Sequence, residues 1–464
     1  MFTKEVLNEL IKILGKERVL SEKEDLVTYS FDGTAAVEST MPDVVVMPGS
    51  TEQVVEIVKI AKKNNIPIYP RGSGTNLSGG AIPINKGIVL SMVQMNKILE
   101  MDPENLCAWV EPGVIIQELN KEAEKHGLIY PPDPGTVLTA TMAGSVSECS
   151  GGLRGLKYGV TKHYVMGMEL VLATGEVIKW GGKTVKNVSG YDLTALFTGS
   201  EGTLGIITKL LMKLIPAPES RKSMLAVYDD LDKAGNTISA IIRNKVIPAT
   251  MEIMDNVTIR TVEEFTHCGL PLEAEAVLLI EVDGYEEVVK REAPLVEKIC
   301  NQYGAVEIRV ANTEEEREAI WFARRNALPS LGQVKPATVL EDATVPRSNI
   351  PAMIKAIRKI AKKYDLFIAT YGHAGDGNLH PTIVIDPTNE DEVDRMHKAV
   401  EEIFHEALAL GGTLSGEHGI GIGKIKFLSL EFGDAGVDVL RRIKEALDPD
   451  YLLNPGKMVK LPKN

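Results

Sequence analysis

Hydrophobic residues recur at helical spacing at the start of the chain. Between residues 4 and 14, Val6, Leu7, Leu10, Ile11 and Leu14 share one stripe, and Gly15 follows them. This period predicts an amphipathic helix that ends at the glycine. The segment carries Glu5 and Glu9 and lacks a cleavable apolar core, so it does not resemble a signal or transit peptide.

Short apolar runs alternate with helical patterns through residues 40–215. Strands are predicted at residues 44–47, 66–69, 88–91, 108–111, 168–172 and 206–209. Ser50-Thr51-Glu52-Gln53 resembles a capping box, and Val54, Val55, Val58 and Ala61 form the inner side of the helix that it opens.

The hydrophobic pattern changes after residues 214–223, LIPAPESRKS. This stretch holds two prolines and shows no periodicity, so we interpret it as a domain boundary. A strand at 224–228, a helix to about residue 243 and a strand at 250–254 follow. A second unit has a strand at 277–282, a helix to about residue 303 and a strand at 306–310. Two such units predict an α+β domain with an antiparallel sheet. We therefore predict domains over 1–217 and 218–412, and a C-terminal segment over 413–464.

Composition narrows the class of protein. The 464 residues argue for two or three domains, because single cores stop growing near ~250–300 residues. The formal net charge of −13 disfavours a nucleic-acid partner. Cys107, Cys149, Cys268 and Cys300 form no CxxC pair, which argues against a disulfide framework or a self-contained iron–sulfur cluster. No apolar run reaches 18 residues, so we expect no membrane span and a cytoplasmic protein.

A glycine-rich stretch, PRGSGTNLSGG at residues 70–80, follows a predicted strand. Glycines allow backbone N–H groups to approach phosphate oxygens closely, and Arg71 adds charge. The stretch fails the GxGxxG pattern at Leu77, and the chain lacks GxxxxGK[ST]. An ordinary tight turn is the alternative interpretation.

Two further segments are rich in small residues. Residues 131–159 read PPDPGTVLTATMAGSVSECSGGLRGLKYG, and residues 199–208 read GSEGTLGIIT. So many small residues in an ordered domain indicate that a large flat group presses against the backbone. A flexible surface loop is the alternative for the first of them.

Histidines and a carboxylate gather among late glycine turns. His373 and His380 bracket a Gly-Asp-Gly-Asn turn, and residues 368–371 and 382–385 are predicted as flanking strands. Two imidazoles with Glu417 would form an open site suited to a catalytic metal, Zn²⁺, Fe²⁺ or Mn²⁺. His418 is then left for proton transfer, for which an imidazole is suited near neutral pH. Core or surface histidines in glycine turns are the alternative.

Basic residues end a predicted helix that Thr313-Glu314-Glu315-Glu316 opens as a capping box. Arg324 and Arg325 follow Trp321 within one turn. Arginine binds carboxylates in a bidentate manner, so this pair is a candidate for substrate binding. A solvated basic pair on an acidic helix is the alternative.

Together these motifs resemble the vanillyl-alcohol oxidase superfamily, and the chain is similar to FAD-linked D-lactate dehydrogenases and glycolate oxidase catalytic subunits, which are related to D-2-hydroxyglutarate dehydrogenase. The resemblance covers roughly residues 10–460. It implies an α+β fold with a two-subdomain FAD-binding domain and a substrate domain whose sheet is antiparallel. The C-terminal segment would return to the flavin, and Glu417-His418 would complete the active site.

The resemblance also implies residue roles. His373, His380 and Glu417 would be metal ligands, His418 the catalytic base and Arg324 the carboxylate-binding residue. The FAD-binding residues would be Pro70, Arg71, Gly72, Ser73, Gly74, Thr75, Pro134, Gly135, Thr136, Thr141, Gly144, Ser147, Ser150, Gly152, Tyr158, Glu201, Gly205, Ile206 and Asn454. Some relatives attach flavin through a histidine in the first loop, where this chain has Gly74-Thr75-Asn76. We expect non-covalent FAD, although Cys149 could in principle attach it.

The predicted reaction is oxidation of a small D-2-hydroxy acid, D-lactate or glycolate, with hydride transfer to flavin N5. A lysine of some 2-hydroxyglutarate enzymes maps near Leu340, which weakens that substrate, and Lys335 is close in sequence. Electrons would pass to a quinone or to a partner protein, an electron-transferring flavoprotein or an iron–sulfur subunit. The alternatives are a metal-dependent hydrolase and an electron-transfer flavoprotein without its own substrate.

Overall fold

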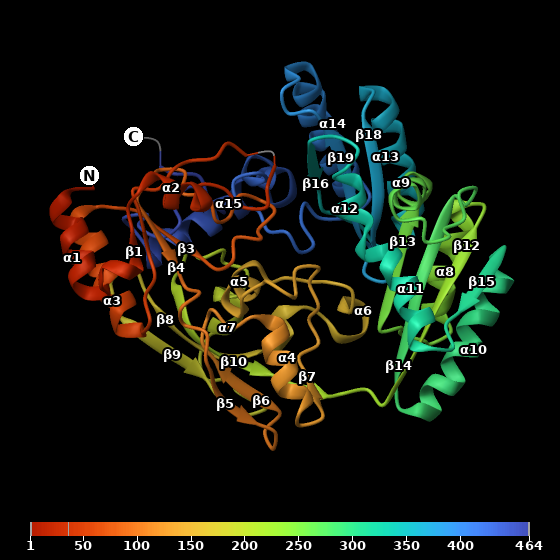
Figure 1. Cartoon of the computed structure of the whole chain (residues 1–464), viewed down its shortest axis with the longest axis horizontal. Coiled ribbons are helices and arrows are strands. Elements are labelled where there is room, and N and C mark those ends of the chain that lie inside the picture. The colour runs from red at the N-terminus through yellow and green to blue at the C-terminus, as the bar shows by residue number, and fades with distance from the viewer. Residues whose placement is uncertain (1, 36, 463–464) are drawn as a thin grey trace. The chain divides into compact units, whose positions relative to one another are not determined.

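The structure is a computed structural model that describes residues 2–35 and 37–462. Its contacts divide the chain into two units. Unit 1 comprises residues 1–150, 160–216 and 417–464, and unit 2 comprises residues 151–159 and 217–416. The segment 151–159, which the sequence placed in the first domain, therefore groups with unit 2. Each unit is described by itself (Figure 1).

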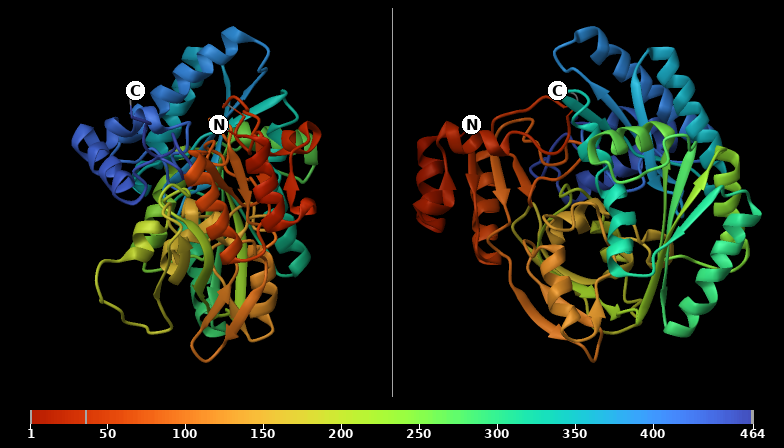
Figure 2. Two further views of the ribbon diagram at one scale, coloured as in Figure 1. Left: turned by 90° about the vertical axis from the view of Figure 1, so that its left-hand side faces the viewer. Right: turned by 45° about the vertical axis from the view of Figure 1, so that its right-hand side comes forward.

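The first sheet of unit 1 has the order β1-β2-β4-β3, formed by β1 (Val19–Leu20), β2 (Val44–Val46), β4 (Ile88–Ser91) and β3 (Ile68–Arg71). Strands β2, β4 and β3 are parallel, and β1 is antiparallel to β2. Helices α1 (Lys4–Leu14) and α3 (Thr51–Asn64) lie side by side next to this sheet and share its core (Figures 1 and 2). Gly15 ends α1, as predicted.

The capping of α3 differs in one detail from the predicted capping box. The Ser50 hydroxyl accepts a hydrogen bond from the Gln53 N–H at 3.4 Å. The Gln53 side chain, however, accepts from the Gly49 N–H at 2.7 Å and not from Ser50. The helix therefore starts where the sequence places it, with the reciprocal contact shifted by one residue.

The second sheet of unit 1 is antiparallel, with the order β5-β6-β10-β8-β9. Its strands are β5 (Ile98–Asp102), β6 (Cys107–Val110), β10 (Ile206–Lys213), β8 (Val165–Val171) and β9 (Val177–Gly181). A small ladder pairs β7 (Leu128–Ile129) with β11 (Ile215–Pro216). The helices of this part are α4 (Ile116–Glu124), α5 (Met142–Glu148), α7 (Leu193–Phe197) and the C-terminal α15 (Leu428–Leu447).

Unit 2 is built on one eight-stranded antiparallel sheet of order β15-β12-β14-β13-β18-β19-β16, with β17 also paired to β19. The strands are β12 (Ser220–Tyr228), β13 (Thr250–Asp255), β14 (Ala276–Gly284), β15 (Glu307–Val310), β16 (Ala337–Leu340), β17 (Ala343–Thr344), β18 (Phe367–His373) and β19 (Asn378–Ile385). Strand β12 begins at Ser220, earlier than the strand predicted at residues 224–228.

The helices of unit 2 cover its sheet. They are α6 (Gly155–Tyr158), α8 (Leu231–Arg243), α9 (Asn256–Thr266), α10 (Glu286–Gln302), α11 (Glu314–Arg325), α12 (Ala327–Leu331), α13 (Ile350–Tyr364) and α14 (Glu390–Ala409). Residues of α9, α11 and α12 share a core with Leu225, Met254, Leu279 and Tyr371 of the sheet. The capping box at Thr313 is confirmed, because its hydroxyl accepts from the Glu316 N–H at 3.2 Å.

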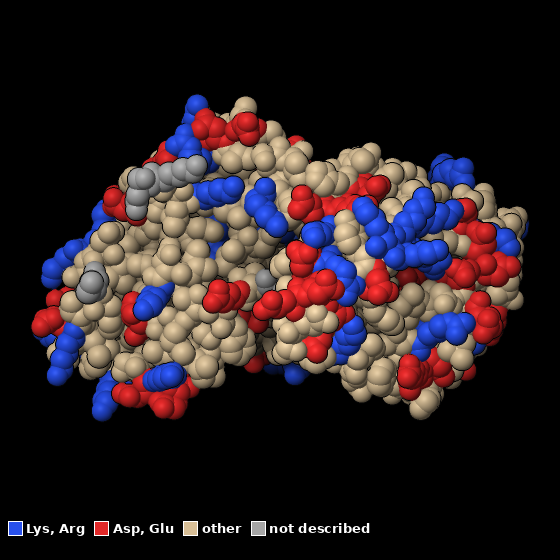
Figure 3. Space-filling model, turned by 90° about the horizontal axis from the view of Figure 1, so that it is seen from above, with Lys and Arg blue, Asp and Glu red and all other residues tan. Residues whose placement is uncertain are grey.

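Acidic and basic side chains are interspersed on the face drawn in Figure 3. Exposed ion pairs such as Lys59–Glu56 contribute little to stability because water screens them. Among the described residues, no helix is both long and apolar enough to cross a bilayer.

Candidate active site

The imidazoles of His373 and His380 lie on one face of the sheet of unit 2. Strands β18 and β19 form a hairpin in which Tyr371 lies opposite His380 and His373 opposite Asn378. Because side chains alternate along a strand, this register places both imidazoles on the same side. Their ring centroids are 5.0 Å apart, and a ring nitrogen of each lies within 4.8 Å of the other. The hairpin therefore presents two nitrogen ligands together, as predicted from its length.

The turn of this hairpin requires glycine. Gly377 has φ +83°, and a Cβ there would lie 1.9 Å from the Val345 carbonyl oxygen. The Gly377 N–H donates to the His373 carbonyl at 3.0 Å. The glycine thus lets the chain reverse immediately after the first imidazole.

A buried carboxylate that the sequence analysis missed holds His373. Glu252 on β13 lies directly opposite His373 on β18 and has no exposed surface. Its Oε1 is 2.7 Å from His373 Nδ1, and its Oε2 accepts from Arg324 Nε at 2.7 Å. A carboxylate bonded to one ring nitrogen fixes the tautomer and directs the other nitrogen toward a metal.

The charge state of Glu252 follows from its partners. Burial raises the pKa of Glu252, but the charges and hydrogen bonds of His373 and Arg324 outweigh it, so that the net pKa is lowered. Glu252 is therefore ionised, and His373 Nδ1 must donate. In the sequence, Glu252 is marked only by its position as a single acidic residue within the predicted strand 250–254.

Arg324 is placed at the same group of side chains. Its guanidinium lies 4.6 Å from the centre of the Tyr371 ring and uses Nε for Glu252. The two terminal nitrogens carry four further N–H donors, which is the fork that binds carboxylates. Arg325, by contrast, is half exposed and pairs with Glu318 at 2.6 Å. The structure thus separates the two arginines, and only Arg324 joins the histidine group.

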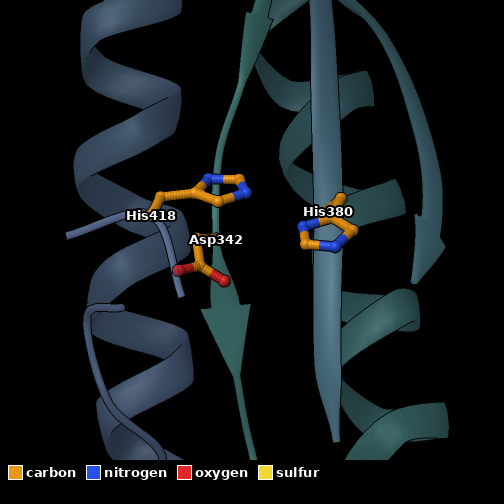
Figure 4. Close-up of side chains that lie close together, drawn as sticks. All are labelled: Asp342, His380 and His418. Carbon is orange, nitrogen blue, oxygen red and sulfur yellow. The ribbon is translucent and has the colours of Figure 1, made fainter. Parts of the chain in front are cut away.

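Asp342 is a second acidic residue that the sequence analysis missed. A carboxylate oxygen of Asp342 lies within 4.8 Å of a His380 ring nitrogen. Figure 4 shows these two side chains, with His380 on β19 and Asp342 just after β16; the third labelled residue, His418, belongs to unit 1. Asp342 Oδ2 accepts from the Ser415 hydroxyl at 2.8 Å and from the Gly416 N–H at 2.7 Å. Asp342 therefore holds the residue that directly precedes Glu417.

Glu417 and His418 begin the last segment of unit 1. Their side chains approach each other, with His418 Nε2 3.9 Å from Glu417 Oε1. The Ile422 N–H donates to the Ser78 carbonyl at 2.9 Å. Within unit 1, the segment that carries the predicted base thus lies on the first glycine-rich loop.

The predicted cofactor segments converge in unit 1. A Cβ on Gly72 would lie 2.2 Å from Thr141 Oγ1, and a Cβ on Gly202 would lie 3.4 Å from Pro70 Cγ. The Glu201 N–H donates to the Ser147 carbonyl at 2.8 Å, and the Asn454 amide donates to the Glu201 carbonyl at 2.7 Å. Four segments far apart in the sequence therefore contact one another within unit 1.

Individual residues of these segments differ in their surroundings. Ser73, Gly135 and Thr136 are exposed, and no atom lies within 4 Å of a Cβ built on Gly135. The partly exposed residues are Pro70, Gly72, Gly74, Thr75, Gly144, Ser147 and Ser150. Pro134, Thr141, Gly205 and Asn454 are buried, and Ile206 is a core residue at the start of β10. A cofactor contact at these positions remains a prediction.

Three predicted cofactor residues have other contacts in the protein. The Arg71 guanidinium is buried and donates to the Phe31 carbonyl at 2.8 Å. Gly152 and Tyr158 belong to unit 2, where the Tyr158 hydroxyl donates to Asp283 Oδ2 at 2.7 Å. Direct contact with a cofactor also remains a prediction for these residues.

Comparison with known proteins identifies the family. Residues 42–181 match the family described as FAD binding domain, and residues 217–458 match the family described as FAD linked oxidases, C-terminal domain. The chain belongs to the FAD-linked oxidases. This FAD-linked oxidase is 50% identical to the glycolate oxidase subunit GlcD of Bacillus subtilis, over 99% of this chain and 97% of that protein. It is also 37% identical to a D-lactate dehydrogenase of Anaerostipes hadrus, over 97% and 96% of the two chains.

Solved structures agree on the fold. A p-cresol methylhydroxylase with bound substrate matches 99% of this oxidase and 97% of its own chain, with a TM-score of 0.83 and 20% identity. An identity this low supports the fold alone. The α+β fold with an FAD-binding domain and a large antiparallel sheet is therefore confirmed. Assignment to the oxidases also disfavours the alternative of a metal-dependent hydrolase. A hydrolase would give no role to the glycine-rich loops near the start of the chain.

The residues of unit 1 fit FAD as the cofactor that the family implies. Gly72 and Gly202 leave room for the side chains of Thr141 and Pro70, and the space at Gly135 is open. Such glycine loops let N–H groups face phosphate oxygens. The Cys149 thiol is free, and burial raises its pKa, which disfavours the thiolate that covalent attachment needs.

Proposed function

We propose that this FAD-linked oxidase oxidises a small D-2-hydroxy acid, D-lactate or glycolate, to the 2-oxo acid. Its support comes from two sources: relatives named as a glycolate oxidase subunit and as a D-lactate dehydrogenase, and the side chains in unit 2. The observation that carries it is the pair of 2.7 Å contacts by which Glu252 joins His373 to Arg324.

In this proposal the substrate carboxylate binds the terminal nitrogens of Arg324. Because Glu252 fixes Nε, the guanidinium has a set orientation before substrate arrives, and a set orientation lowers the barrier to reaction. Lys335 is paired with Glu392, and Leu340 at the end of β16 is apolar. Neither residue supplies a second anion site, which favours a substrate with one carboxylate.

His373, His380 and Glu417 would hold one divalent ion. The donor set fits, because two imidazoles with adjacent ring nitrogens and a carboxylate are typical of catalytic Zn²⁺, Fe²⁺ or Mn²⁺ sites. When bound, such an ion supplies Lewis-acid chemistry that lowers the pKa of a substrate hydroxyl.

His418 would take the proton of the substrate hydroxyl as the C2–H bond breaks. When bound, FAD would supply the acceptor for the hydride lost from C2, so that substrate oxidation and flavin reduction would balance. The electrons then leave for a separate acceptor, which we propose to be a partner protein such as an electron-transferring flavoprotein or an iron–sulfur subunit, or a quinone.

Anaerobic mixing with D-lactate, L-lactate and glycolate tests this function. D-lactate or glycolate should bleach the visible flavin absorbance, whereas H418A should retain FAD and fail to bleach. His397, exposed on α14, provides the matched control H397A, which should bleach like the wild type. Elemental analysis should find one divalent ion per chain. Full bleaching in H418A would remove His418 from the mechanism. If the wild type is not bleached by any of these acids, the alternative of an electron-transfer flavoprotein without its own substrate is favoured.

A further inference from the structure

Glu201 has an unusual backbone for its residue type. It is buried in the turn between α7 and β10 and has φ +52°, in the left-handed region that non-glycine residues seldom adopt. Its N–H donates to the Ser147 carbonyl and its own carbonyl accepts from Asn454. Glycine would adopt this conformation more readily, so the residue at this position is explained by its side chain.

That side chain binds the turn directly after His418. Glu201 Oε1 accepts from the Ile420 N–H at 2.6 Å, and Oε2 accepts from the Gly421 N–H at 2.7 Å. A Cβ on Gly419 would lie 3.0 Å from Glu201 Oε1 and 2.4 Å from Glu148 Oε2. Two carboxyl groups of unit 1 therefore lie against the backbone of Gly419, the residue next to His418.

The two carboxyl groups differ in what surrounds them. Burial and the charge of Glu201 raise the pKa of Glu148 well above its ordinary value. Burial also raises the pKa of Glu201, but the two amide donors and the charges of Lys457 and Lys424 oppose this rise. The net pKa of both groups is raised, and the two N–H donors favour the ionised form of Glu201.

We propose that Glu201 is a positioning residue that holds the Gly419–Gly421 turn and thereby fixes the imidazole of His418. The role rests on the proposed function, in which His418 is the base. It differs from the cofactor contact predicted from the sequence, because both carboxylate oxygens are directed to the backbone of the turn. Gly419 follows His418 directly and gives the backbone there many accessible conformations, which two bonds to the next two amides restrain.

The first test is E201Q. Glutamine offers one oxygen and one NH₂ group, so one of the two amides loses its acceptor and faces a donor. We expect kcat to fall by about 10- to 100-fold, because small displacements of a catalytic group cost rate to that degree. KM and FAD content should stay close to wild type. E201D keeps both carboxylate oxygens and should therefore have a kcat between those of E201Q and wild type. If E201Q does not fold, kcat is compared between E201D and wild type instead.

E169Q is the matched control. Glu169 is another buried carboxylate of unit 1, and it accepts from the hydroxyls of Thr51 and Thr208 at 2.9 and 3.0 Å. These contacts do not involve the residues around His418. Whatever its effect on the unfolding free energy, E169Q should leave kcat unchanged. A loss of kcat in E169Q equal to that in E201Q would overturn the proposal.

Two further measurements separate this role from the proposed function. Amide hydrogen exchange of a peptide covering residues 415–424 should be faster in E201Q than in wild type or E169Q, with or without FAD. In the H418A background, E201Q should cause no further loss of residual rate, because a residue that acts through His418 is not additive with it.

The outcomes are distinguishable. Wild-type kcat and wild-type exchange in E201Q would overturn the positioning role, whatever H418A does. A loss of FAD with an unchanged rate per bound flavin would show a cofactor contact and also overturn it. If H418A bleaches like wild type while exchange is faster in E201Q, Glu201 holds the turn but the assignment of His418 as base fails.

Discussion

Removing the carboxylate of Glu252 should weaken metal binding without any change to a metal ligand. The side chain has no exposed surface and makes two 2.7 Å contacts, one to His373 Nδ1 and one to Arg324 Nε. In E252Q, one of these two donors loses its acceptor and meets an NH₂ group instead. Either His373 loses the bond that directs its other nitrogen, or Arg324 loses its orientation; E252A removes both contacts.

The magnitude follows from these contacts. Loss of a hydrogen-bonding partner of a metal-binding histidine typically lowers metal affinity by about 10- to 100-fold. A hydrogen bond to a charged group contributes about 1.5–3 kcal/mol, so E252Q should lose about that much unfolding free energy. E252A breaks both contacts of a buried charge network and should lose about 3–5 kcal/mol.

Stability should also respond to pH in a defined direction. The partners of Glu252 hold its net pKa below the ordinary value, despite burial. A carboxylate with a lowered pKa contributes stability above its unfolded pKa, about 4.3, and this contribution is lost as the pH falls through the folded pKa. Wild-type unfolding free energy should therefore decrease more steeply than that of E252Q in this acidic range.

Competition with a chelator measures the metal affinity, and urea unfolding measures the stability. Glu281 on β14 gives the control E281Q, because this buried carboxylate accepts from the Ser223 hydroxyl at 2.6 Å on the same sheet. E281Q should lose stability but keep its metal affinity. If E252A binds metal as tightly as wild type, the assignment of His373 as a ligand oriented by Glu252 is wrong.

Three other changes test separate parts of the structure. D342N replaces a carboxylate oxygen that accepts from the Gly416 N–H, so kcat should fall while FAD content stays constant; an unchanged kcat would contradict a role in holding this backbone. G72A would place a Cβ 2.2 Å from Thr141 Oγ1, so flavin affinity should drop and stability should fall by about 1–3 kcal/mol, as measured by fluorescence titration and thermal unfolding. Burial lowers the pKa of Lys457 to about 7. Between pH 7 and about 10 the unfolded chain therefore binds more protons than the folded chain, so the unfolding free energy of the wild type should rise with pH. In K457M this rise should be absent, as urea unfolding at several pH values would show.

Local patterns predicted the elements that hold the imidazoles. The hairpin at His373 and His380 follows from two apolar runs around a glycine turn, and both runs are strands in the structure. The strand predicted at residues 224–228 begins earlier, at Ser220, within the stretch interpreted as a domain boundary. Strands β5 and β9 were missed because they are short and partly exposed, so their hydrophobic pattern is weak.

The carboxylates that support the histidines were not predictable in the same way. Glu252 meets His373 only because β13 pairs with β18, and the two residues are 121 positions apart. That register is set by packing of the whole sheet, and a one-residue slip would direct Glu252 to the opposite face. A single sequence carries the local alternation of each strand but not the pairing between strands.

The short segment around Glu417 and His418 shows why such distant carboxylates are needed. It is flanked by Gly416 and Gly419, and glycine leaves the backbone many accessible conformations. In unit 2 Asp342 accepts from the Gly416 N–H, and in unit 1 Glu201 accepts from the Ile420 and Gly421 N–H groups. Only three residues separate Gly416 from Ile420, so few backbone torsions remain unrestrained between these contacts. Acceptors outside the segment thus supply the order that a helix or strand would otherwise give, and the glycines leave room for close approach of the chain.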